Sequence, residues 1–235
     1  MRLIFIRHAE PDYEHDSLTE KGWREAQLLA GRTRDWHVDD FYVSPLGRAR
    51  DTASFTLRAQ NKTAQTMDWL HEFQGQLPDG QGGARICWDL MPDLWTAQPE
   101  LLQPVGWENA PILQGTNVKA EYDRACAGLD TLLERYGYFR CGGYYESRQA
   151  SDACTVCFCH LGITCVLLSH MWNVSPFTLL HGLFLAPSSV TVLQTEERQP
   201  GIAYFRAQTI GSTSHLLAGG EPVSIYGSFA EPFQG

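Results

Sequence analysis

The order of secondary structure in the first sixty residues is the feature that most limits the fold. Residues 2–6 form a short apolar run typical of a β-strand, and residues 20–34 carry apolar side chains at helical spacing behind Thr19, a residue typical of helix N-caps. The same order then repeats, with a strand over 40–43 and a helix that continues to about residue 59. Strands and helices that alternate in this way favour an α/β fold, a three-layer sandwich whose mostly parallel sheet is covered by helices on both faces.

A long irregular segment interrupts this alternation between residues 74 and 115. It is rich in Gly, Pro and Gln and holds tryptophans at 88, 95 and 107. Since irregular stretches of this length in compact domains are usually functional, we expect a cap with one or two short helices, inserted into a single domain that spans residues 1–235. The other expected elements are a strand over 63–70, a helix over 118–136, a buried strand over 154–159, a helix over 163–172, and a hairpin of strands 190–195 and 203–207 joined by a long loop.

Charge and cysteine content limit the partners of the chain. There are 18 Lys and Arg residues against 27 Asp and Glu residues, a net charge of −9, which repels nucleic acids and anionic membranes. An anionic ligand therefore needs a local positive pocket. The cysteine number, 7, is odd, and the first apolar run is too short for a secretory signal, so we expect reduced thiols in the cytoplasm. The longest apolar stretch is far shorter than the roughly 20 residues that a membrane span requires. The oligomeric state stays open.

Five side chains suited to phosphate chemistry follow the predicted strands. Arg7 and His8 end the first strand, Arg48 lies in the turn after the second, Glu72 follows the third, and His160 follows the cysteine-rich strand. Because ligands of doubly wound sheets bind beyond the carboxyl ends of the strands, we expect these side chains to converge on one crevice. The planar fork of arginine matches phosphate oxygens, and a neutral imidazole can attack phosphorus. The sequence therefore predicts a site that binds and cleaves a phosphate ester.

The motifs around these side chains are Arg7-His8-Ala9-Glu10, Leu18-Thr19-Glu20-Lys21-Gly22, Ser44-Pro45-Leu46-Gly47-Arg48-Ala49-Arg50-Asp51-Thr52-Ala53, Leu70-His71-Glu72 and His160-Leu161-Gly162. Together they resemble the histidine phosphatase superfamily, the phosphoglycerate-mutase-like fold. The resemblance covers both ends of the chain and leaves residues 74–115 and 140–150 unmatched. Because Glu10-Pro11-Asp12 contains no arginine, the chain is similar to the intracellular branch of mutases and phosphatases and not to the acid phosphatases and phytases.

This resemblance implies a metal-independent phosphomonoesterase, a hydrolase that uses no cofactor and acts on a small-molecule phosphorylated substrate. His8 would be the nucleophile and carry the phosphoryl group during turnover, and Arg7, Arg48 and His160 would bind the phosphoryl oxygens with it. Glu72 would protonate the leaving alcohol and then take a proton from the attacking water. Fixed cations directed at these oxygens stabilise the charge of the transition state. A phosphoglycerate-type phosphomutase and a non-catalytic regulatory protein that binds a phosphorylated ligand stay open as alternatives.

This chain departs from the family pattern in three places. Ala9 stands where glycine is usual, and alanine does not easily take a positive φ, which can shift the loop that presents the nucleophile. The next loop is short and offers Glu14 or His15 where mutases place an asparagine against the phosphate. A mutase also holds a second phosphate with further basic residues, whereas the one cation of the cap is Arg85. These departures favour a phosphatase over a mutase.

Two features of the cap stay open. Glu108 and Asp93 of the cap are further candidates for the acid beside Glu72. The tryptophans suggest a substrate with an apolar or aromatic body, but they can equally belong to the hydrophobic core. The sequence does not decide between these alternatives.

The cysteines near His160 are spaced like metal or redox ligands. Cys154 and Cys157 form a Cys-x-x-Cys pair, and Cys159 comes directly before the histidine. Side chains alternate along a strand, however, so Cys157 and Cys159 should face away from Cys154 and His160. We therefore expect small buried apolar side chains here, and no metal site.

Overall fold

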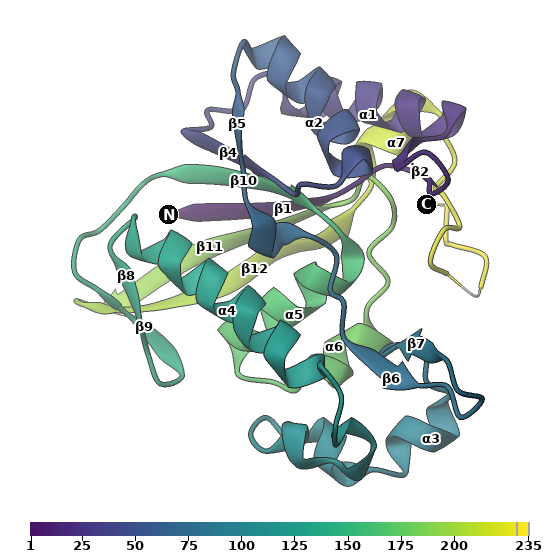
Figure 1. Cartoon of the computed structure of the whole chain (residues 1–235). Helices are drawn as coiled ribbons and strands as arrows, with labels where there is room; N and C mark the ends of the chain where they lie inside the picture. Colours follow the sequence, from purple (N-terminus) through teal and green to yellow (C-terminus); the bar gives the residue numbers. More distant parts are fainter. Residues whose placement is uncertain (229, 235) are drawn as a thin grey trace.

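The structure is a computed structural model, and it describes residues 1–228 and 230–234. Within these residues its central sheet has eight strands in the order β5-β4-β10-β1-β11-β12-β9-β8 (Figure 1). The strands from β5 to β1 run parallel, and those from β11 to β8 extend the sheet antiparallel. The predicted α/β fold with its parallel core is confirmed. The strands are β1 (Arg2–Arg7), β4 (Asp40–Val43), β5 (Ala64–Thr66), β8 (Tyr138–Cys141), β9 (Tyr144–Ser147), β10 (Cys154–Cys159), β11 (Val190–Gln199) and β12 (Ile202–Ser212).

Helices cover both faces of the sheet, as expected (Figure 1). Successive side chains of β1 point to opposite faces of the sheet and pack into two separate hydrophobic clusters. Phe5 lies in the cluster with α4 and α5, whereas Ile6 lies in the cluster with α1 and α2. Nowhere in residues 1–228 and 230–234 is a helix both long and apolar enough to cross a membrane. One face carries α1 (Glu20–Thr33), α2 (Gly47–Gln60) and α7 (Ser214–Gly219), and the other carries α4 (Val118–Glu134), α5 (Leu161–Trp172) and α6 (Pro176–Gly182).

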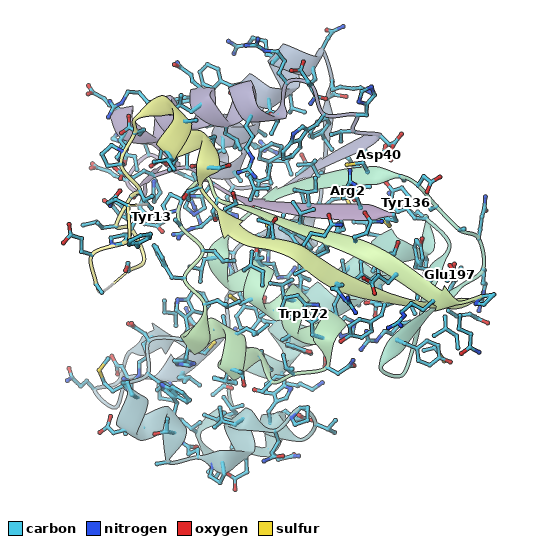
Figure 2. The ribbon with its side chains drawn as sticks, turned by 180° about the vertical axis from the view of Figure 1, so that it is seen from behind. Arg2, Tyr13, Asp40, Tyr136, Trp172 and Glu197 are labelled. Carbon is cyan, nitrogen blue, oxygen red and sulfur yellow. The ribbon has the colours of Figure 1, made fainter. Side chains whose placement is uncertain are left out.

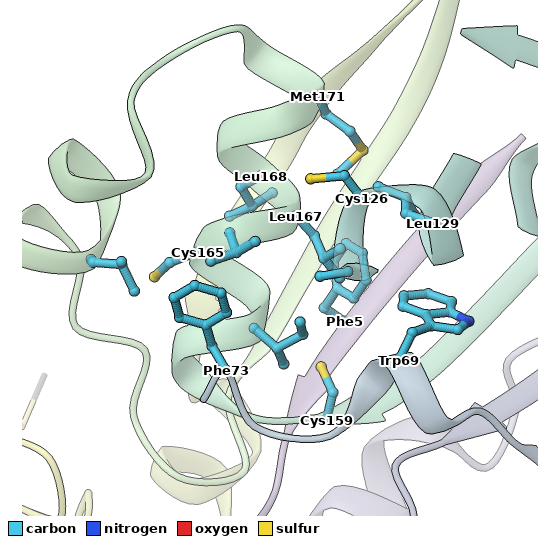
Figure 3. Close-up of a cluster of buried hydrophobic side chains, with 14 of the residues drawn as sticks. Phe5, Trp69, Phe73, Cys126, Leu129, Cys159, Cys165, Leu167, Leu168 and Met171 are labelled. Carbon is cyan, nitrogen blue, oxygen red and sulfur yellow. The ribbon is translucent and has the colours of Figure 1, made fainter. Parts of the chain in front are cut away.

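Helix α5 lies at the centre of the larger hydrophobic cluster. Its residues are buried on almost every side, which is typical of a helix enclosed by other elements. Figure 3 shows Leu167 and Met171 of this helix beside Cys126 and Leu129 of α4. Since His160 comes directly before α5, it stands on one of the most firmly packed elements of the molecule.

Several predicted elements differ in length from those observed. Thr19 accepts the N–H of Gly22 at 3.0 Å and caps α1, as predicted. The strand expected over 63–70 is shorter in the structure. β5 ends at Thr66, and a short 3-10 helix, η1 (Asp68–Leu70), follows it. The long loop expected in the last hairpin is also wrong: only two residues separate β11 from β12, and the second, Gly201, has φ +81°, typical of a tight turn.

Residues 74–115 contain more regular structure than the sequence indicates. Trp107 is buried against the rings of Tyr122 from α4 and Phe177 from α6. This part of the segment therefore shares the core of the α4 to α6 face, and Trp107 belongs to that core. The segment contains β6 (Gln76–Pro78), β7 (Ala84–Ile86), α3 (Pro92–Thr96), and the 3-10 helices η2 (Pro99–Leu102), η3 (Trp107–Asn109) and η4 (Pro111–Leu113).

Candidate active site

Neighbouring parallel strands end at one edge of the sheet and bring the residues that follow them together. β1 ends at Arg7, whose partner in β10 is Cys159, and β4 leads directly into Ser44. His8 and His160 come next, and their ring centres lie 5.1 Å apart. The structure thus places Arg7, His8 and His160 together at the edge where the sequence predicts them.

His8 is buried, and a hydrogen bond fixes its tautomer. Its Nδ1 lies 2.7 Å from the carbonyl oxygen of Ala9, and since a carbonyl only accepts, Nδ1 carries the ring proton and Nε2 the lone pair. Burial lowers the pKa of His8 well below its usual value, and Arg7 and Arg48 lower it further. The ring is therefore neutral at pH 7. Ala9 does not have a positive φ, so this alanine carries no strain of that kind.

His160 is held by Ser44, a residue that the sequence did not single out for this role. Ser44 Oγ lies 2.7 Å from Nε2 of His160 and accepts the N–H of Leu46 at 3.3 Å. The hydroxyl can donate to Nε2, and in that tautomer the ring proton lies on Nδ1. Within the described residues, the buried Nδ1 has no hydrogen-bond partner. Burial, with His8 and Arg48 nearby, lowers the pKa of His160 well below its usual value.

Arg7 is buried beneath the loop that follows α6. Its Nη1 donates to the carbonyl oxygen of Leu185 at 2.5 Å, whereas its Nε is buried without a partner in the described part of the chain. Burial lowers the pKa of Arg7, and the nearby Tyr13 and Glu72 oppose this effect. A guanidinium stays charged at neutral pH. Arg7 is therefore a fixed cation with donor capacity left over.

Arg48 lies in the first turn of α2 and is oriented by the loop between β2 (Pro11–Asp12) and β3 (Ser17–Leu18). Its Nη1 donates to Asp16 Oδ1 at 2.7 Å, and Asp16 Oδ2 accepts the N–H of Gly47 at 2.6 Å. The Tyr13 ring centre lies 5.3 Å from the guanidinium carbon. The Nε of Arg48 is also buried, and it has no hydrogen-bond partner among the described residues.

The loop between β2 and β3 differs from what the sequence predicts. Glu14 and His15 are exposed, and His15 hydrogen-bonds with Asp12 at 2.8 Å. Tyr13 and Asp16, which the sequence did not single out, are instead the residues of this loop that contact Arg48. No local pattern in the sequence marks them, because their contacts depend on how the loop folds back onto α2.

Glu72 follows η1 and not a strand end, and its carboxylate faces the N-terminus of α5. It accepts the N–H groups of Phe73 at 2.7 Å, Ile163 at 2.9 Å and Gly162 at 3.3 Å. His160, the N-cap residue of α5, makes no side-chain capping bond within the described residues. Glu72 therefore caps α5 from outside the helix. The sequence placed it near the crevice but gave no sign of this contact.

Trp88 lies beside Glu72 and contributes an aromatic surface to this side of the site. A Cβ added to Gly162 would come within 2.7 Å of the Trp88 ring and 2.9 Å of Glu72 Oε1, so only glycine fits there. Trp88 also stacks on Phe73, with ring centres 6.3 Å apart. The other candidate acids lie elsewhere on the 74–115 segment: Asp93 is exposed on α3, and Glu108 is on η3.

Behind the loop that carries His8 lies a group of carboxylates. Glu10 accepts hydrogen bonds from Thr19 at 2.9 Å and from Ser224 at 2.7 Å. Glu25 of α1 is fully buried; its Oε2 accepts the Glu10 N–H at 2.9 Å, and its Oε1 lies 4.0 Å from Lys21 Nζ. Burial raises the pKa of Glu25 to about 7. This carboxylate thus holds the loop through its hydrogen bond with the Glu10 N–H.

The cysteines of β10 divide between the two faces of the sheet as predicted. Cys157 and Cys159 belong to the cluster with α4 and α5, and Cys154 to the cluster with α1 and α2. Burial raises the pKa of Cys159 to about 12, so this thiol stays protonated at neutral pH. In the described part of the chain, no group of three or more His, Cys, Asp or Glu side chains has the arrangement of a metal site.

Comparison with known proteins agrees with this arrangement. The family profile of the histidine phosphatase superfamily (branch 1) matches residues 3–208. A 2,3-bisphosphoglycerate-dependent phosphoglycerate mutase of Thermoplasma acidophilum is 30% identical over 155 residues, which are 56% of this chain and 76% of the mutase. Phosphoserine phosphatase 1 of Hydrogenobacter thermophilus is 24% identical over 147 residues, 58% of this chain and 66% of that protein.

Solved structures share the fold over most of the chain. A mutant phosphoserine phosphatase of Entamoeba histolytica in complex with phosphoserine has a TM-score of 0.62 at 21% identity, and the match covers 92% of this chain and 98% of that one. A mycobacterial glucosyl-3-phosphoglycerate phosphatase has a TM-score of 0.62 at 19% identity, covering 90% and 98%. On the family profile and the shared fold, this chain belongs to the histidine phosphatase superfamily, branch 1.

Proposed function

We propose that this protein is a phosphatase that hydrolyses a small phosphomonoester through a phosphohistidine intermediate on His8. One observation carries the proposal. A neutral imidazole with its Nε2 lone pair free lies near His160, Arg7 and Arg48. The Nε atoms of both arginines and Nδ1 of His160 are buried without a partner in the described residues. Buried donors without partners are costly, and phosphoryl oxygens would satisfy all of them at once.

The first step transfers the phosphoryl group to the enzyme. Nε2 of His8 forms a bond to phosphorus as the bond from phosphorus to the alcohol oxygen breaks. The donors of Arg7, Arg48 and His160 face the other phosphoryl oxygens, where charge builds up in the transition state. The leaving oxygen takes a proton from Glu72, and the alcohol departs.

The second step returns the phosphoryl group to water. Glu72, now ionised, takes a proton from a water molecule whose oxygen attacks phosphorus, and the bond to His8 breaks to release inorganic phosphate. Glu72 must therefore be protonated when the substrate binds.

The relatives limit the substrate class. Phosphoserine and glucosyl-3-phosphoglycerate phosphatases share the fold, which supports hydrolysis of a phosphorylated small molecule. The phosphoglycerate mutase relative keeps a second candidate open. That activity requires a second phosphate to be held near the first, and the one cation of the 74–115 segment is Arg85. We therefore favour the phosphatase.

The test is release of inorganic phosphate from a panel that includes phenyl phosphate, phosphoserine and 3-phosphoglycerate, with and without a chelator. Hydrolysis should survive the chelator, and His8→Ala should lower the rate by at least about 1,000-fold, because it removes the covalent pathway. An acid quench during turnover should trap an acid-labile phosphoprotein in the unmodified protein and none in His8→Ala.

Other results would overturn the proposal. Turnover that survives His8→Ala, or that stops with the chelator, contradicts the phosphohistidine pathway. Isomerisation of 3-phosphoglycerate in the presence of 2,3-bisphosphoglycerate, faster than phosphate release, would assign the mutase. Tight phosphate binding without turnover of any ester would assign a regulatory phospho-ligand-binding protein.

A further inference from the structure

Two neighbouring tyrosines lie beside the arginines of the site, and one of them stands over Arg48. Tyr13 follows β2, and its ring lies 5.3 Å from the guanidinium carbon of Arg48. It is also near enough to Arg7 to influence the pKa of that group. The ring centre of Tyr226 lies 6.2 Å from that of Tyr13. An aromatic pair thus covers the side of the site where the two cations lie.

The C-terminal segment, residues 221–228, carries Tyr226. Figure 2 shows Tyr13 beside the yellow C-terminal part of the chain. Glu221 forms ion pairs with Lys21 at 3.0 Å and Arg24 at 2.9 Å, and the Ser224 hydroxyl donates to Glu10 at 2.7 Å. Gly227 lies directly on Arg7, since a Cβ added there would be 3.2 Å from its Nη2. The segment is therefore held against the site at several points.

Neither tyrosine packs into the hydrophobic core. Tyr13 is 60% exposed and Tyr226 is 40% exposed, and neither belongs to a hydrophobic cluster of the described residues. Trp107, by contrast, is buried in the core. Large apolar side chains left exposed beside a binding site are typical of surfaces that meet a ligand.

We infer that Tyr13 and Tyr226 form a subsite for an aromatic or planar apolar group on the alcohol part of the substrate. The inference rests on the proposed phosphatase. With its phosphate bound between Arg7 and Arg48, the ester would extend outward past the two rings, and its apolar group would stack on them. The preferred substrates are then arylalkyl phosphate esters or others with a planar apolar body.

The experiment compares benzyl phosphate with ethyl phosphate, whose alcohols leave with similar difficulty, so that the ratio of their kcat/KM values reports binding of the ring and not leaving-group chemistry. The unmodified protein should prefer benzyl phosphate. Tyr226→Ala and Tyr13→Ala should each reduce the ratio by about 5- to 10-fold, mainly through KM for benzyl phosphate. Tyr226→Phe, which keeps the ring, should retain it.

Tyr204→Ala is the matched control, because Tyr204 is 38% exposed on β12; it should leave the ratio as it is. The subsite is refuted if the unmodified protein shows no preference for benzyl phosphate, or if the alanine variants lose activity equally on both esters. A protein that hydrolyses phenyl phosphate through His8 but fails this comparison remains a phosphatase. One that hydrolyses no ester refutes the proposed function, and the subsite with it.

Discussion

The two sides of the loop that follows β1 bury polar groups in opposite ways. On one side, which we call the phosphate side, lie His8, His160, Arg7 and Arg48. Both arginine Nε atoms and Nδ1 of His160 are buried there without partners in the described residues. On the other, the carboxylate side, are the three side chains Glu10, Glu25 and Glu221.

The carboxylate side is almost saturated by its own neighbours. Glu10 has two hydroxyl donors and Glu221 has two cations; the one exception among the described residues is Oε1 of Glu25. Paired groups of this kind stabilise the fold, whereas buried donors without partners are typical of a site that a ligand completes. We therefore expect substitutions on the phosphate side to change catalysis, and those on the carboxylate side to change stability.

After the loss expected for His8→Ala, the largest effect on catalysis should come from Glu72→Gln. Glutamine can still accept an N–H from the start of α5, but it cannot donate a proton to the leaving alcohol. The kcat/KM for an ethyl ester should fall by at least about 100-fold, and that for an aryl ester by only a few-fold, because the aryl oxygen leaves without protonation. Equal losses on both esters would move the acid role to another carboxylate, which Glu108→Gln and Asp93→Asn would then locate.

Arg48→Lys should have the next largest effect. Lysine supplies a point charge where Asp16 and the phosphate together require a planar fork. We expect kcat/KM to fall by at least about 10-fold, equivalent to roughly 1.4 kcal/mol of transition-state stabilisation. Arg50→Lys, on the exposed side of the same helix, is the control and should be close to normal. Near-normal activity in Arg48→Lys would remove this arginine from the site.

Glu25→Gln tests the carboxylate side and should have the smallest effect on catalysis, within about twofold. The pKa of Glu25 is raised by burial from 4.5 to about 7, so the folded protein binds this proton more tightly than the unfolded chain. The free energy of unfolding should then fall as the pH rises from about 4.5 to about 7, by roughly 3 kcal/mol. Glutamine should remove this loss and keep the hydrogen bond to the Glu10 N–H.

Urea unfolding at pH 5 and pH 8 measures the difference. Glu20→Gln, an exposed position on the same helix, should keep the pH dependence of the unmodified protein. If Glu25→Gln shows the same pH dependence as Glu20→Gln, the buried carboxyl group does not titrate as inferred. If it lowers kcat/KM by more than about 10-fold, the separation of the two sides fails.

The sequence predicts the site residues at the strand ends better than the contacts made to the site from distant parts of the chain. Arg7, His8 and His160 come together because strand periodicity and strand ends can be read locally. The contact of Glu72 with the start of α5 and the support of His160 by Ser44 span 91 and 116 positions in the chain. No periodic pattern encodes contacts at that separation, and the same holds for the approach of Tyr226 to Tyr13.

The position of β1 in the sheet has a consequence for the order in which the protein can assemble during synthesis. Arg7 and His8 are made long before the strands that hold β1 in the sheet, because β1 pairs with β10 and β11, whose last residues are Cys159 and Gln199. This strand must therefore wait for its partners until the chain has been synthesised to the end of β11. Such long-range pairing is intrinsically slow, so a product truncated before β10 would carry His8, Arg7 and Arg48 but would lack His160 and the strand that holds β1 in the sheet.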